Sequence, residues 1–93
     1  MPKYYDYKVG NYYLYFTDKC IVEAFHVHAS NKGMKEAGSA KFFVYSNGDT
    51  SIVKTGRLTK HSLTTIQRFI KKHHVEMYKL WSKNSDNGYY TKR

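Results

Sequence analysis

Residues 59–82 carry the pattern that most constrains the fold, because apolar side chains recur there with the period of an α-helix. The apolar positions are Leu63, Ile66, Ile70, Met77 and Trp81. Thr59 is a suitable N-cap residue, since its hydroxyl can accept a hydrogen bond from a backbone N–H of the first turn. The pattern predicts an amphipathic helix of about 22 residues, from about Thr59 to Ser82, whose apolar stripe packs on a second layer.

The residues before this run supply that layer, because they follow the two-residue period of β-strands. Residues 4–9 and 12–16 are rich in aromatic side chains and are separated by Gly10-Asn11, a pair typical of a tight hairpin. Residues 25–29 then alternate apolar side chains with two histidines. We expect three short strands from these segments.

A second hairpin is predicted from residues 40–45 and 50–55, which flank Asn47-Gly48. Asn-Gly is the strongest short hairpin signal, because a type I′ turn needs positive φ at both central residues. The pairs that such a turn creates are Phe43 with Ile52 and Phe42 with Val53.

Together these patterns predict an α+β fold, with an antiparallel sheet of about five short strands packed against one long C-terminal helix. We expect a single domain over residues 1–83 and a flexible C-terminal tail over residues 84–93. No apolar run approaches the ~18 residues of a membrane span, the first residues lack a secretory leader, and the single cysteine excludes an internal disulfide. These features favour the cytoplasm.

The net charge of +9 is concentrated in the C-terminal part of the chain. Residues 1–53 hold six lysines and five acids, whereas residues 54–93 hold ten lysines and arginines and two acids. On the predicted helix the basic side chains lie away from the apolar stripe: Lys60, Arg68, Lys71, Lys72, Lys79 and Lys83. This asymmetry indicates a polyanion or an acidic protein as partner, although a solvated helix face explains it equally well. Nucleic-acid phosphates would be bound by Arg68, Lys71, Lys72 and Lys79.

His26 and His28 are the residues best suited to chemistry. At positions i and i+2 of a strand, both imidazoles leave the same face of the sheet. They could chelate a metal, with Asp18, Cys20 or Glu23 as further ligands, or act as acid and base on a phosphodiester. Structural histidines that hydrogen-bond to the sheet explain the same pattern, so the sequence assigns no metal and no cofactor.

Familiar catalytic motifs are missing from this sequence. It has no glycine-rich phosphate loop, no Gly-x-Ser-x-Gly and no paired carboxylates, and Cys20 has no His or Asp partner at a fixed spacing. An ordinary hydrolase is therefore disfavoured, and a protein without catalysis is the better expectation. A metal-independent ribonuclease that uses His26 and His28 stays open.

Three stretches together resemble one bacterial family, domain of unknown function 4160 (DUF4160). They are Tyr12-Tyr13-Leu14-Tyr15-Phe16-Thr17-Asp18, the strand His26-Val27-His28, and the helix that starts at Leu58-Thr59-Lys60-His61-Ser62-Leu63 and ends at Leu80-Trp81. The likeness spans about residues 9–83. The chain departs from many members in having Glu23-Ala24 where they have Pro-Pro before the histidines, and its loop at 30–39 is longer than in the shortest members.

The family has no established activity, but its genes often lie beside a second small gene, which implies a toxin–antitoxin-like pair. Three functions follow from the residues and the resemblance. The first is RNA or polyanion binding within such a module. The second is docking of a small acidic partner protein without catalysis, and the third is the ribonuclease that uses the two histidines.

Overall fold

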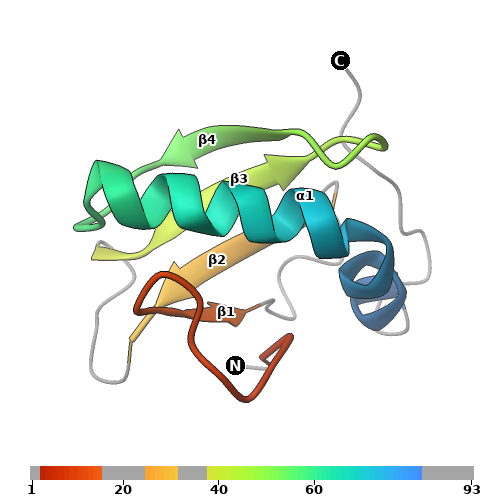
Figure 1. The fold of residues 1–93 in the computed structure, drawn as a ribbon, viewed down its shortest axis with the longest axis horizontal. Coiled ribbons are helices and arrows are strands. Elements are labelled where there is room, and N and C mark those ends of the chain that lie inside the picture. Colours follow the sequence, from red (N-terminus) through yellow and green to blue (C-terminus); the bar gives the residue numbers. More distant parts are fainter. Residues whose placement is uncertain (1–2, 16–24, 32–37, 83–93) are drawn as a thin grey trace.

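The computed structural model describes residues 3–15, 25–31 and 38–82. Its elements are β1 (Tyr13–Tyr15), β2 (His26–Ser30), β3 (Ala40–Val44), β4 (Thr50–Lys54) and α1 (Lys60–Ser82). The four strands form one antiparallel sheet in the order β1-β2-β3-β4, and α1 lies across one of its faces (Figure 1). The predicted α+β fold is confirmed, with four strands in the described residues.

The start and the phase of α1 agree with the sequence pattern. The Thr59 hydroxyl accepts a hydrogen bond from the backbone N–H of Ser62 at 3.2 Å, as an N-cap does. All five residues of the predicted apolar stripe are buried. Each such side chain contributes roughly 1.5–3 kcal/mol through burial, so the stripe holds α1 on the sheet.

The core lies between α1 and the face of the sheet that carries Leu14, Val27 and Phe42, all of which are buried. Phe25, just before β2, packs its ring at 5.5 Å from Trp81, near the end of the helix. Because side chains alternate along a strand, the neighbouring positions point to the opposite face of the sheet. That outer face carries Tyr13, Tyr15, His26, His28 and Phe43.

The first predicted turn is present, but the N-terminal strand is reduced to two bridges. Gly10 and Asn11 have φ of 57° and 73°, and Val9 and Tyr12 exchange two backbone hydrogen bonds, as a type I′ turn requires. From Lys3 to Val9 the chain advances six residues, while its partner advances only three, from Tyr15 to Tyr12. The segment between these two bridges is therefore too long to pair residue by residue with its partner. Two of its residues, Tyr5 and Tyr7, pack on α1 instead.

The register predicted for the second hairpin is wrong by one residue. Phe42 pairs with Ile52 and Phe43 with Ser51. The reason is the turn. Gly48 donates its N–H to the carbonyl of Tyr45, and Tyr45 donates to the carbonyl of Asp49. Within this turn only Gly48 has positive φ, 88°. The loop is therefore a type I turn closed by a left-handed glycine, and it has three residues, not two.

Several predictions concern residues outside the described ranges. These are the flexible tail at 84–93, Lys83 of the predicted basic set, and the three additional metal ligands, Asp18, Cys20 and Glu23. Within the described residues, no helix combines the length and the apolar character needed to cross a membrane.

Candidate functional site

The solvent side of α1 carries a row of positive charge that we call the cationic ridge, formed by Arg68, Lys72 and Lys79. All three side chains are exposed, and none forms an ion pair with an acid of the described residues. They lie on the side of the helix opposite the buried stripe, where Ile70 and Met77 pack into the core. At ~1.5 Å rise per residue the ridge is about 16 Å long.

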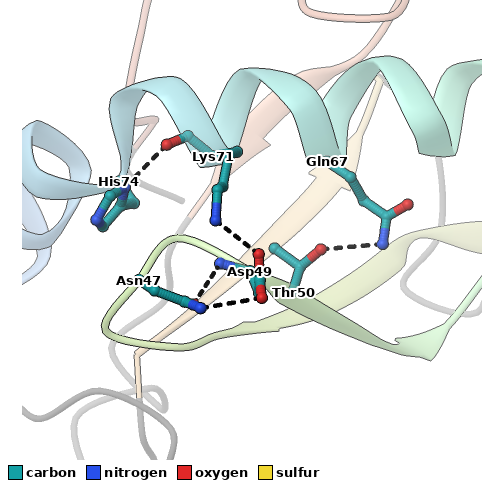
Figure 2. A network of polar contacts seen from close by, with 6 residues as sticks. All are labelled: Asn47, Asp49, Thr50, Gln67, Lys71 and His74. Atoms are coloured by element: carbon teal, nitrogen blue, oxygen red, sulfur yellow. Dashed lines mark hydrogen bonds and ion pairs between the residues drawn. The ribbon is translucent and has the colours of Figure 1, made fainter.

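Lys71 belongs to a different environment from the rest of the predicted basic set. Its Nζ lies 2.7 Å from Oδ1 of Asp49, in the turn between β3 and β4 (Figure 2). Both side chains are about half exposed, and pairs of this kind contribute only about 0–1 kcal/mol. The carboxylate nevertheless offsets the positive charge of Lys71, so Lys71 attracts an incoming anion less strongly than an unpaired lysine would.

The turn itself holds Asp49 in place. The side-chain amide of Asn47 donates to the Asp49 carboxylate at 3.0 Å, and the backbone N–H of Asp49 donates to the Asn47 side-chain oxygen at 3.0 Å. A further hydrogen bond, from Gln67 to the Thr50 hydroxyl at 2.9 Å, ties β4 to α1 (Figure 2). Gly48 allows the turn to lie close to α1, since a Cβ added at this position would lie 2.6 Å from Nδ1 of His74.

A shallow hollow of about 530 Å³ lies between α1 and this turn. Its walls come from Gly48, Asp49 and Thr50 on one side and from Thr64, Gln67, Arg68 and Lys71 on the other. The lining holds two cations for one acid, so the hollow continues the positive surface of the cationic ridge toward β4.

The opposite flank of α1 carries an aromatic cluster formed by Tyr5, Tyr7, Phe69 and His73. The Phe69 and His73 rings stack at 4.2 Å, and the Tyr5 and Tyr7 rings stack at 5.2 Å. Tyr5 meets Phe69 edge-on at 5.4 Å, which joins the two stacks. His73, at the margin of the apolar stripe, is therefore a packing residue of this flank.

Tyr5 also anchors this flank through its hydroxyl, which donates a hydrogen bond to Oε1 of Glu76 at 2.7 Å. Burial raises the pKa of Tyr5, and the hydrogen bond to Glu76 and the negative charge of that residue raise it further. The phenol is thus held neutral, and it stays a donor throughout the physiological range.

The two histidines of β2 share a face, as the alternation predicts. Their ring centroids are 5.0 Å apart on the outer face of the sheet, away from α1. His26 is only 1% exposed and lies edge-on to Phe43, and His28 is half-buried. A general acid and a general base must both reach the substrate, so the burial of His26 does not favour the ribonuclease hypothesis.

A metal centre gains no additional ligands from the described residues. Among residues 3–15, 25–31 and 38–82, no three side chains of the His, Cys, Asp or Glu type come together in a group that could hold an ion. The metal hypothesis therefore depends on residues outside these ranges.

Comparison with known proteins now adds the family. The model of domain of unknown function DUF4160 matches residues 11–82. The chain belongs to this family. The match covers β1, the His-x-His strand and all of α1, including the cationic ridge. Tyr5 and Tyr7 precede the matched residues. No curated protein and no solved structure matches the chain.

Two features of the site were missed by the sequence reasoning. The ion pair between Lys71 and Asp49 joins residues 22 positions apart, and no local pattern signals it. The aromatic cluster left a signal, because Phe69 and His73 are four residues apart and thus neighbours on one flank of the helix.

Proposed function

We propose that this protein binds RNA or a similar polyanion through the cationic ridge of α1. The observation that carries the proposal is the arrangement of Arg68, Lys72 and Lys79, three exposed cations on the side of the helix that faces away from the core, which pair with no acid of the described residues. Such a row neutralises successive phosphates and releases their counterions, which provides affinity without reading sequence.

Supporting this proposal, the ridge stands on a rigid element whose opposite side is fully packed. Its side chains can reach phosphates without any change in the core. The hollow beside β4 extends the positive surface through Arg68, and Lys71 contributes less, because Asp49 already neutralises it. Of the four cations predicted from the sequence, we therefore assign the main role to three.

The test is a titration of a fluorescent RNA at several salt concentrations. We expect the variant R68Q/K72Q/K79Q to bind more weakly at low salt. The slope of log affinity against log salt should fall by ~0.7–0.9 for each phosphate that the variant no longer neutralises. Thermal stability should stay close to that of the wild type, since these side chains are exposed.

The matched control is K3Q/K54Q/R57Q, which removes three exposed cations from other parts of the surface. This variant has the same net charge as the ridge variant but should keep most of the slope. An equal loss of affinity in both variants would show that only net charge matters, and the ridge would then have no special role. A wild type that binds no RNA at low salt would rule out the proposed function.

In the same proposal, the protein acts in the cytoplasm as one component of a toxin–antitoxin-like module. The resemblance that placed the chain in its family supports the module, and a single cysteine suits a reducing compartment. Co-expression with the neighbouring gene should change growth relative to either gene alone, and the absence of any effect would argue against such a pair.

Docking of a small acidic partner protein is a second candidate, and edge strand β4 favours it. Ile52 and Val53 are 39% and 53% exposed there, and Lys54 ends the strand. Apolar side chains beside cations on a sheet edge suit an acidic partner that adds a strand. Co-purification with the product of the neighbouring gene, abolished by I52K, is the expected result. A complex that survives I52K would place docking elsewhere.

A further inference from the structure

We propose that Tyr7 is a stacking platform for an unpaired base, so that the preferred ligand is single-stranded nucleic acid rather than a duplex. This inference rests on the proposed function and names its substrate class. Single-stranded ligands are bound by cations that follow the backbone together with aromatic rings on which bases stack. In this protein the cations lie on α1, and Tyr7, from the N-terminal segment, packs against Phe69 of the same helix.

Tyr7 is exposed although it belongs to an aromatic cluster. More than half of its surface, 53%, is open to solvent. Its ring nevertheless has a defined orientation. Tyr5 stacks on it at 5.2 Å with an interplanar angle of 23°, and Phe69 meets it at 6.2 Å and 77°. A ring held in this way presents its exposed side to a ligand with little loss of conformational entropy.

The cluster also places Tyr7 beside the cationic ridge. Phe69, which contacts Tyr7, directly follows Arg68 and lies three residues before Lys72, within one turn of the helix. A base stacked on Tyr7 would therefore have its phosphate on the side of the ridge.

The nearby acids limit where the strand can run. Asp6 is exposed next to Tyr7, and the Glu76 carboxylate lies one turn beyond Lys72, where Tyr5 holds it by a hydrogen bond. Phosphates should follow the ridge and avoid both carboxylates. An A-form duplex keeps its bases stacked and paired, so it can use the ridge but not the Tyr7 ring.

The test compares a fluorescent single-stranded RNA with an RNA duplex of equal phosphate number at one low salt concentration. For wild type we expect tighter binding of the single strand. Y7A should weaken single-strand binding by ~5–150-fold, the effect of removing one stacked base, and leave duplex binding unchanged. Y7F, which keeps the ring, should bind like the wild type.

A direct spectroscopic readout separates stacking from a structural effect. The only native tryptophan, Trp81, is buried, so the wild type provides the background signal. The emission of Y7W should be quenched by the single strand and not by the duplex. Y13A, which removes a half-buried tyrosine from the outer face of the sheet, is the matched control and should bind like the wild type.

The outcomes distinguish the two proposals. If neither RNA binds at low salt, the proposed function fails. If both RNAs bind equally and Y7A changes neither, the polyanion function stands and the stacking inference is wrong. An equal loss of affinity for both RNAs in Y7A, or a loss in Y13A that matches Y7A, would also overturn the stacking role of Tyr7.

Discussion

Among the described residues, the flank of α1 that faces the β3–β4 turn is held by hydrogen bonds and one ion pair, whereas the flank that faces the N-terminal segment is held mainly by aromatic rings, with one hydrogen bond from Tyr5 to Glu76. The polar flank joins Lys71 to Asp49 and Gln67 to Thr50. The aromatic flank stacks Phe69 on His73 and places Tyr5 and Tyr7 against them. Both flanks belong to one helix, and the same buried stripe runs between them.

The two kinds of contact differ in energy, because on folding a polar contact at the surface replaces hydrogen bonds to water with hydrogen bonds within the protein. Their net contribution is small, and salt weakens the ion pair. Aromatic contacts remove apolar surface from water and, because they involve no charge pair, are not screened by salt. We infer that the aromatic flank and the stripe hold α1 in position, while the polar flank leaves a hollow beside the cations at little cost in stability.

The largest effect should come from the stripe that both flanks share. Ile70→Ala removes a fully buried side chain and should lower the free energy of unfolding by ~2–5 kcal/mol, as core truncations do. The measurement is urea denaturation. A decrease below ~0.5 kcal/mol, the range of neutral surface changes, would mean that the stripe does not hold the helix.

Phe69→Ala breaks the aromatic flank. Because Phe69 is half-buried, we expect the free energy of unfolding to fall by about 2 kcal/mol, below the ~3–5 kcal/mol of a fully buried Phe. The decrease should be the same at low salt and at about 1 M salt, since no charge is removed. A cost that shrinks strongly with salt would contradict the distinction between the flanks.

On the polar flank, a double-mutant cycle with K71Q and D49N measures the ion pair. We expect a coupling of ~0.3–1 kcal/mol at low salt that decreases at about 1 M salt, because both charges are solvent-exposed and salt weakens their attraction. K72Q is the control, because Lys72 is exposed on the cationic ridge and should change stability by less than ~0.5 kcal/mol. A coupling above about 2 kcal/mol would make this flank as important as the aromatic one.

Tyr5→Phe should have the smallest effect at neutral pH, about 0.5 kcal/mol, because it removes one exposed hydrogen bond. The raised pKa of Tyr5 adds a signature at high pH. Its contribution is complete below the ordinary tyrosine pKa of 10.0 and is lost as the pH rises above that value, since the unfolded chain then ionises first. The stability difference between wild type and variant should therefore shrink, or change sign, above that pH. A difference that is constant across this window would show that Tyr5 titrates normally.

The N-terminal segment shows where local pattern was insufficient. The alternating tyrosines at positions 5 and 7 are typical of a strand, yet the ladder is interrupted there and both rings pack on α1. The turn at Gly10-Asn11 was predictable, because two left-handed residues leave few alternatives. Whether a Tyr ring packs within a sheet or on a helix depends on which apolar surface is near, and that surface lies far along the chain, at Phe69.

The second hairpin shows the limit of turn chemistry. Asn47-Gly48 correctly predicts a hairpin, but Gly is suited both to a two-residue type I′ turn and to the closing position of a three-residue turn. The structure adopts the second, since Asn47 lacks the positive φ that a type I′ turn needs at both central residues. The one-residue change in register follows from it.

The sequence by itself determined the α+β class, the start and phase of α1, and the residues of its buried stripe, because period, N-cap and burial are properties of neighbouring residues. It also determined that His26 and His28 share a face and that the helix carries an excess of positive charge. Only the tertiary structure decided which helix cation is paired, which histidine is buried and which tyrosine is exposed. These properties depend on contacts between segments far apart in the chain, such as Asp49 with Lys71 and Tyr5 with Phe69, and those contacts form only when the sheet and α1 come together.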